Sequence, residues 1–336
     1  MTSKDALQQN ATLSLDEYLL RTEALDRTEP LDAPTIFHEP WWLDIATQEK
    51  MGMVESREHG KVVGRLYYPQ HNRCGIISSN MPPFTHFLGP AIDPGSGSPL
   101  TRRLKTLSIT ADLIAKLPRL SAFRQKMHRG ITDAVAFQAA GFESLVQFTY
   151  EINPDNEQTI WSGMRDKTRN AIRNGAKLHN LTDAFDPDRF IDFYRRNVKG
   201  LGLTENVDLE IARRLTRRCL EQHCGKFFVA KDEHGTDKAA IFIVWDRHSC
   251  YYLMSTRAAD SSYGAIPSLL WEAIKFAITS NRIFDFDGVI NEGSVKLFIS
   301  FGSVTSPRYI VERSTTAYKL LRLIRRSLSE TRNPFC

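Results

Sequence analysis

The sequence predicts a mixed α/β fold in which helices and strands build a sheet with an antiparallel meander at its centre. After residue 178 the hydrophobic periodicity gives a strand, two helices, three strands, and then helices and strands in alternation. The three consecutive strands are joined by the short polar turns D-E-H-G and D-R-H-S, and strands joined in this way pair antiparallel. An antiparallel meander excludes a simple doubly wound parallel sheet.

The first part of the chain has fewer clear elements. Thr132 is a favourable N-cap and Gly141 a favourable residue just past a helix C-terminus, so a short helix is predicted between them. Alternating or continuous apolar runs predict the strands, and apolar residues at intervals of three and four predict the other helix. The predicted elements are strands at 61–68 and 74–78, a helix around 104–114, a helix at 132–141 and a strand at 142–152.

The second part opens with a row of cations, Arg165, Arg169, Arg173 and Lys177, at intervals of four. If residues 161–177 form one helix, these side chains lie along one side of it. Such a ridge favours an anionic ligand, although a solvated helix face is the alternative. The elements predicted after it are helices around 186–200, 208–223, 267–279 and 294–300, and strands at 226–231, 238–246, 250–255, 283–287 and 308–312.

Composition limits the class of protein. The 336 residues carry a net charge of +5, and the first 35 hold seven acidic and three basic residues, so the remaining chain is basic and favours an anionic ligand. No apolar run approaches the ~20 residues that span a bilayer, and no secretory signal follows Met1, which predicts a cytoplasmic protein. Five scattered cysteines without a C-x-x-C pair predict reduced thiols and no metal site.

Three segments, W-S-G-M-R-D-K-T-R-N-A-I-R-N-G-A-K at 161–177, F-D-F-D-G at 284–288 and L-F-I-S-F-G at 297–302, carry local motifs. Together they resemble the acyl-CoA N-acyltransferase (GNAT) superfamily, and within it the Fem-type aminoacyl transferases and their acetyltransferase-like relatives. The segment from Trp161 to Lys177 resembles the family stretch W-x(n)-R-x-x-I-R-x-A/G-x-K. The strand F-D-F-D-G at 284–288 is similar to the family's D-F-x-G, and L-F-I-S-F-G at 297–302 to its F-K-x-x-F-G. A weaker match is G-F at 141–142 followed by T-Y at 149–150.

The resemblance implies an α/β (α+β mixed sheet) GNAT-like fold with two GNAT-like domains in tandem, and N-acyltransferase activity. With a boundary at Asn153-Pro154-Asp155, the expected segments are an acidic N-terminal extension at 1–35, a divergent GNAT-like domain at 36–153, a GNAT-like acyltransferase domain at 154–314, and a basic C-terminal helix and tail at 315–336. It also implies no permanently bound cofactor, with acyl-CoA or an aminoacyl-tRNA as co-substrate.

The sequence departs from the family at two places. Ile299 stands where F-K-x-x-F-G has its lysine, and Lys296, one helical turn earlier, is the nearest substitute. The pyrophosphate-binding loop Q/R-x-x-G-x-G/A of CoA-dependent members corresponds to Arg257–Pro267, which keeps only Gly264 and Ala265 at the helix start. These departures leave the acyl donor open.

Acyl transfer to an amine needs a group that accepts the amine proton. Strand periodicity places Asp285 and Asp287 on one face, opposite Phe284 and Phe286, so either aspartate can serve as the base. Alternatively, one of them ties down the backbone near Gly288, or Glu292 is the base. His38 and His86 are expected in loops of the first domain, where they could meet an acceptor, although a lone histidine in a loop is more often only a surface hydrogen-bonding group.

Other polar residues are candidates for the donor site. Tyr263, or Tyr252 on its strand, can protonate the leaving group, although strand aromatics more often belong to the core. Residues expected to bind donor or substrate are Arg169, Arg173, Lys177, Tyr252, Arg257, Gly264 and Lys296.

The basic amphipathic stretch at 316–328 is expected to dock on the protein itself, with contact to an anionic membrane at its inner face as the alternative. The leading function is an N-acyltransferase that acylates an amine of a sugar, cell-envelope precursor or amino-acid-like metabolite, including lipid- or nucleotide-linked acceptors. The alternatives are an aminoacyl-tRNA-dependent transferase, with tRNA as partner, and a non-catalytic binding subunit. No DNA partner is expected.

Overall fold

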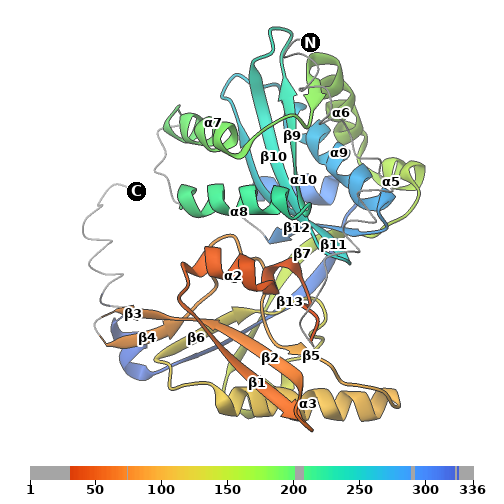
Figure 1. Cartoon of the computed structure of the whole chain (residues 1–336). Helices are drawn as coiled ribbons and strands as arrows, with labels where there is room; N and C mark the ends of the chain where they lie inside the picture. Colours follow the sequence, from red (N-terminus) through yellow and green to blue (C-terminus); the bar gives the residue numbers. More distant parts are fainter. Residues whose placement is uncertain (1–30, 74, 201–207, 289–291, 322–323, 325–336) are drawn as a thin grey trace, which may run out of the picture.

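The computed structural model describes residues 31–73, 75–200, 208–288, 292–321 and 324 (Figure 1). The acidic stretch at 1–30 and the end of the C-terminal helix lie outside the described residues. The first half contains η1 (Ile36–His38), α2 (Pro40–Thr47), α3 (Pro99–Lys116), α4 (Val135–Ala139), β1 (Met51–Glu58), β2 (Lys61–Pro69), β3 (His71–Arg73), β4 (Ile76–Ser79), β5 (Ala91–Ile92), β6 (Ala122–Lys126) and β7 (Glu143–Ile152).

From residue 180 onward, the second half follows the order that the hydrophobic pattern predicts. It contains α5 (Glu157–Gly163), α6 (Asp166–Leu178), β8 (Asn180–Thr182), α7 (Pro187–Gly200), α8 (Leu209–Glu221), β9 (Gly225–Lys231), β10 (Asp237–Trp245), β11 (Ser249–Arg257), α9 (Ala265–Thr279), β12 (Ile283–Gly288), α10 (Glu292–Ser300) and β13 (Val304–Ser314). The predicted meander is confirmed, because β10 pairs antiparallel with both β9 and β11.

One ten-stranded mixed sheet runs through both halves in the order β3-β4-β6-β13-β7-β12-β11-β10-β9-β8, and β1, β2 and β5 form a separate sheet. The last strand, β13, lies between β6 and β7 of the first half and pairs antiparallel with both (Figure 1). The sheet is thus continuous across Asn153. The division into domains at that residue stays a prediction.

Among the described strands, each half has one parallel pair, and its other strand pairs are antiparallel. In the first half β4 pairs parallel with β6 through Ser78↔Ala122, and in the second half β11 pairs parallel with β12 from Ser249↔Ile283 to Tyr251↔Asp285. This shared local topology agrees with the mixed-sheet tandem fold that the sequence predicts.

Helices cover both faces of the second half. Alternate residues of β10 enter two cores: Phe242 and Val244 pack with α2, α7 and α8 on one face, and Ile241 and Ile243 pack with α6, α9 and α10 on the other. Burial on both faces explains why β10 is an unbroken apolar run rather than an alternating one.

The single helix predicted over 161–177 is wrong. The chain forms two helices, and Met164 and Arg165 between them are extended, with ψ angles of 151° and 139°. The backbone N–H of Arg165 donates to the carbonyl of Ser300 at 3.0 Å, a tertiary bond that a continuous helix cannot form. Arg165 therefore precedes α6 and leaves the ridge, which keeps Arg169, Arg173 and Lys177.

Two smaller predictions also need correction. Helix α4 begins at Val135 after Ala134, not after Thr132. Gly141 is left-handed with φ +80°, as predicted for its position after the helix.

In the described part of the C-terminal helix, Leu320 and Leu321 are 58% and 47% exposed, so they do not dock on the protein. Among the described residues, none of the helices combines the length and apolar character needed to cross a membrane.

Candidate active site

The central feature of the site is the place where β11 and β12 diverge. Their parallel pairing ends at Tyr251↔Asp285, although β11 continues to Arg257 and β12 to Gly288. On its other side β11 stays paired with β10, but the register shifts so that Leu253 is an extra, unpaired residue of a β-bulge. Bulges re-aim backbone and side-chain groups and are common beside active sites. The bulge lies just beyond the last parallel pair.

Asp287 lies two residues past the last parallel pair on β12, as the bulge residue Leu253 does on β11. If the parallel register is continued two residues past Tyr251↔Asp285, Leu253 stands opposite Asp287. Asp287 has φ +59°, in the left-handed region, which is uncommon for residues other than glycine and costs about 1–3 kcal/mol. Such strain persists only where surrounding contacts enforce it.

Those contacts come from the first half of the chain. Nζ of Lys126, in β6, lies 2.8 Å from Oδ1 of Asp287, and Nδ1 of His86 lies 3.4 Å from Oδ2. The side chain of Asp287 remains 22% exposed. Both halves therefore build this carboxylate site, and His86 is buried rather than a surface group in a loop.

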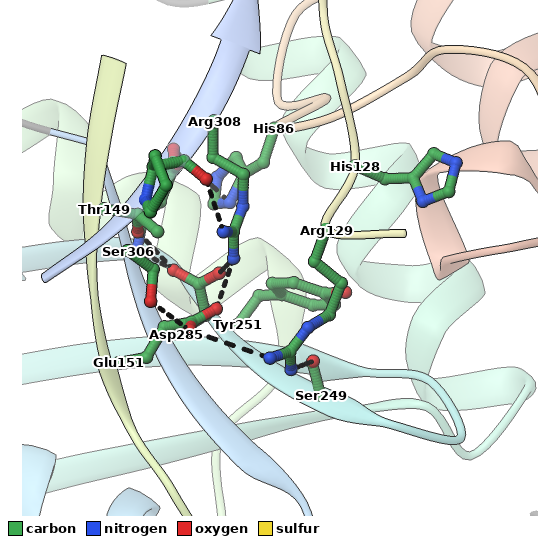
Figure 2. A network of polar contacts seen from close by, with 12 residues as sticks. His86, His128, Arg129, Thr149, Glu151, Ser249, Tyr251, Asp285, Ser306 and Arg308 are labelled. Atoms are coloured by element: carbon green, nitrogen blue, oxygen red, sulfur yellow. Dashed lines mark hydrogen bonds and ion pairs between the residues drawn. The ribbon is translucent and has the colours of Figure 1, made fainter. Parts of the chain in front are cut away.

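A buried polar network lies behind Asp287. Arg308, in β13, is placed between two carboxylates: it pairs with Glu151 and lies 3.3 Å from Oδ2 of Asp285 (Figure 2). The hydroxyl of Thr149 donates to Oδ1 of Asp285 at 2.5 Å. The backbone N–H of Asp287 donates to the same oxygen at 2.8 Å. Asp285 thus ties down the backbone next to Gly288, as one of the two sequence interpretations proposed.

Burial determines the titration of these groups. It raises the pKa of Asp285 to about 6; Arg308 opposes the rise, and the carboxylates of Glu151 and Asp287 add to it. Burial lowers the pKa of His86 to about 4 despite the nearby Asp287 carboxylate, so His86 is neutral at physiological pH. Asp285 is 1% exposed, so a substrate does not reach it directly.

The predicted donor loop leads from β11 into α9. Gly264 is the N-cap of α9 and packs directly against α6: a Cβ on Gly264 would lie 2.3 Å from the carbonyl oxygen of Ala171. Tyr263 is 69% exposed, and Nζ of Lys167 lies 5.8 Å from its ring centre. Arg257 ends β11 and is exposed.

Two of the other predicted site residues have roles within the fold. Nη1 of Arg169 donates to the carbonyls of Trp161, Ser162 and Met164 at 3.3, 2.8 and 2.9 Å, so its guanidinium caps the end of α5. The guanidinium of Arg173 lies 5.2 Å from the ring centre of Trp161.

The remaining predicted residues lie apart from the network. Lys177 is exposed in the last turn of α6. Lys296 is exposed and forms an ion pair with Glu292 at 2.5 Å. Tyr252 directly precedes the bulge, where burial raises the pKa of its phenol to about 12.

The network residues Lys126, Glu151 and Arg308 were not among the predicted site residues. The sequence feature that could have revealed them is a charged residue inside an otherwise apolar strand, such as Glu151 in T-Y-E-I at 149–152. Such a residue is almost never fully buried unless it is paired. The partner cannot be found from the strand alone, because it depends on β13 lying between β6 and β7.

Comparisons with known proteins agree with this fold. Residues 162–292 match the family model of the acetyltransferase (GNAT) domain. The fold is similar to the crystal structure of FemX, with a TM-score of 0.63 and 12% identity over 94% of this chain and 99% of that chain. It is also similar to the C-terminal domain of a putative lysylphosphatidylglycerol synthetase from Agrobacterium fabrum, with a TM-score of 0.54 and 11% identity over 92% and 96%.

A further similar structure is L-PGS from Bacillus licheniformis, with a TM-score of 0.51 and 12% identity over 91% of this chain and 96% of that chain. At 11–12% sequence identity, the similarity to these three structures establishes the fold alone. A search of curated protein sequences gives no match. The family match identifies residues 162–292 as an acetyltransferase (GNAT) domain, which makes the chain a transferase, and the fold of the whole chain is similar to that of FemX.

Proposed function

We propose that this chain transfers an acyl group from acyl-CoA to a primary amine in the gap between β11 and β12. The observation that supports the proposal is the partly exposed carboxylate of Asp287, which is fixed by Lys126 and His86 just past the point where β12 separates from β11. A bulge leaves a backbone N–H without its ladder partner, and such a donor stabilises an oxyanion.

The proposed reaction forms a C–N bond and breaks the C–S bond of the thioester, with proton transfers at the amine and at the leaving sulfur. The amine nitrogen attacks the thioester carbonyl, whose oxygen becomes an oxyanion held by the backbone N–H freed at Leu253. Asp287 accepts the proton that the amine loses as its C–N bond forms. The C–S bond then breaks, and the leaving thiolate takes a proton from the phenol of Tyr252. Asp287 releases its proton to solvent and Tyr252 regains one from solvent, so the enzyme returns to its starting state.

The donor phosphates are assigned to the loop before α9. Free backbone N–H groups and the dipole at a helix N-terminus bind phosphate. Arg257 and Lys167 supply positive charge at this loop, and Tyr263 and Gly264 belong to it. Arg169 is left out of the donor site because its guanidinium caps α5.

The acceptor is assigned by class: an amine of a sugar, a cell-envelope precursor or an amino-acid-like metabolite, which the Fem-like fold favours. Transfer from an aminoacyl-tRNA is the second candidate, because two structures of similar fold are named for lysylphosphatidylglycerol synthesis and the pyrophosphate loop is incomplete. Contact with an anionic membrane through the C-terminal helix remains a proposal; its exposed Leu320 and Leu321 support it.

The proposal is tested by incubating the purified protein with acetyl-CoA, longer acyl-CoAs or charged tRNA against a panel of amines, and reading products by mass spectrometry. Acyl additions support the first donor, and amino-acid additions the second. If no donor gives a product with any amine, the proposed activity is wrong.

Once a product is found, Asp287→Asn tests the base. We expect the turnover rate to fall about 10²–10⁴-fold with donor affinity unchanged, because the amide cannot accept the proton. Asp192→Asn, on the exposed surface of α7, is the matched control. Full activity in Asp287→Asn together with loss of activity in Glu292→Gln would transfer the role of base to Glu292.

A further inference from the structure

A cavity lies at the junction of the two halves, near the start of β11 and β12. It has a volume of 620 Å³, and its lining combines the β10–β11 turn with loops of the first half and the start of β12: Arg129, Asn153, Pro154, Arg247, His248, Asn281 and Ile283. The lining holds two arginines, one histidine and two amide side chains. It contains no acidic side chain.

The guanidinium groups of the two arginines have N–H donors available to bind a ligand. Among the described residues, Arg247 is exposed and forms no ion pair, and Arg129 makes only long contacts, 3.5 Å from Nη1 to Oγ of Ser249 and 3.7 Å from Nη2 to Oε2 of Glu151 (Figure 2). A guanidinium has five N–H donors in a rigid fork that fits an oxyanion bidentately. The side chain of Arg129 is 35% exposed.

The turn that carries Arg247 is rigid. Oδ1 of Asp246 accepts the backbone N–H groups of His248 and Ser249 at 2.8 and 2.9 Å. Its Oδ2 accepts the hydroxyl of Tyr251 at 2.8 Å. The carboxylate of Asp246 is thus engaged within the fold, while the turn presents Arg247 and His248 outward. A pre-organised cationic cavity needs little rearrangement to bind an anion.

We propose that this cavity binds a phosphate group, held by Arg129 and Arg247 with His248 and the amides of Asn153 and Asn281 as further contacts. It is separate from the proposed donor loop, because the cavity lies at the start of β11 and β12 whereas the donor loop follows the end of β11. Arg129 also contacts Glu151, which belongs to the buried polar network behind Asp287. A phosphate bound to Arg129 is therefore one residue away from that network.

The test is a titration of the full-length protein with inorganic phosphate, followed by ³¹P NMR line broadening and by the midpoint of thermal unfolding, against sodium chloride at equal ionic strength. We expect saturable phosphate binding that Arg247→Ala weakens about tenfold, as the loss of a charge-assisted bidentate contact requires. Arg119→Ala, an exposed arginine outside the cavity, is the matched control and keeps the affinity of the natural protein.

A parallel titration with CoA distinguishes the source of the phosphate. If Arg247→Ala weakens both inorganic phosphate and CoA, the cavity holds a phosphate of the donor; if only inorganic phosphate is weakened, it holds a free or acceptor-borne phosphate. The proposal is overturned if phosphate has no saturable effect, or if Arg247→Ala and Arg119→Ala bind phosphate equally. Because Arg247 is exposed, its substitution leaves the fold intact, and neither result depends on transferase activity.

Discussion

Arg169 illustrates how a residue of a family-like motif can serve the fold. Its guanidinium binds three carbonyls at the end of α5, where the last C=O groups of a helix have no partner within the helix. These contacts hold α5 against α6 at the break between them. The motif position is therefore explained without a ligand.

Replacing Arg169 by alanine tests this role. We expect Arg169→Ala to lower the free energy of unfolding by about 1–3 kcal/mol, because the carbonyls lose a charged donor. Affinity for acyl-CoA should stay the same. Arg173→Ala, which removes an exposed neighbour on the same helix, should change stability by less than about 0.5 kcal/mol.

Urea denaturation and CoA titration of both variants provide the measurements. If Arg169→Ala keeps the free energy of unfolding but loses donor binding, Arg169 binds the ligand and its structural role is wrong.

The aspartates show how far single residues can be predicted. Side chains alternate between the two faces of a strand, and this rule correctly places Asp285 on the opposite face from Phe284 and Phe286, which are buried in an apolar core. It does not reveal that Asp285 contacts Arg308, because that contact needs β12, β7 and β13 side by side. The positive φ of Asp287 is likewise enforced by tertiary contacts, so no local pattern predicts it.

At the scale of elements, the packing of α6 on α9 depends on two glycines. A Cβ on Gly175 would lie 2.3 Å from the carbonyl oxygen of Gly264, and a Cβ on Gly264 would meet the backbone of α6 just as closely. Backbone faces backbone at this crossing, so neither partner can move aside as a flexible side chain would. The start of α9, and with it the donor loop, is positioned by this contact.

Gly175→Ala should therefore destabilise the protein by about 2–4 kcal/mol, in the range of overpacked cores. The comparison is Gly163→Ala in α5, where an added Cβ meets no atom within 4 Å. That change should be neutral or stabilising by up to about 1 kcal/mol, since alanine is the better helix former. Equal midpoints in urea for the two variants would show that the α6–α9 contact adjusts freely.

Long elements with one consistent period could be predicted, and short or mixed ones could not. The apolar run of β10 was predicted within one residue of its observed bounds, and the periodic apolar residues placed α9 within two residues and α3 within five. Strands β1 and β6 were missed because M-G-M-V-E-S-R-E and A-F-R-Q-K carry no clear alternation. The break before α6 was missed because it depends on a bond to Ser300, far along the chain.

At the scale of the whole molecule, the two halves share their structure. β13 completes the sheet of the first half, and Lys126 and His86 of the first half hold Asp287 of the second. The first half therefore contributes to the proposed site as well as to the fold. We expect the chain to unfold as one cooperative unit, which makes its global stability sensitive to the buried groups at the junction.

Three of those groups are histidines, His38, His86 and His128, which are neutral in the fold. Burial lowers the pKa of His38 well below its ordinary value of 6.5, and that of His86 and His128 to about 4. The unfolded chain thus binds more protons than the folded chain between about pH 4 and 6.5, so stability falls as pH falls through this window. Asp285 acts oppositely, because its raised pKa lets the folded state bind a proton there first.

Because three histidines oppose one aspartate, the free energy of unfolding should decrease on acidification from pH 6.5 to 4.5. Each proton difference contributes up to about 1.4 kcal/mol per pH unit, so a net slope of about 1–3 kcal/mol per unit is expected. Urea denaturation at intervals across this range measures it. A free energy of unfolding that stays constant or rises as the pH falls would mean that the three imidazoles are protonated in the folded state, and that the junction is open to water.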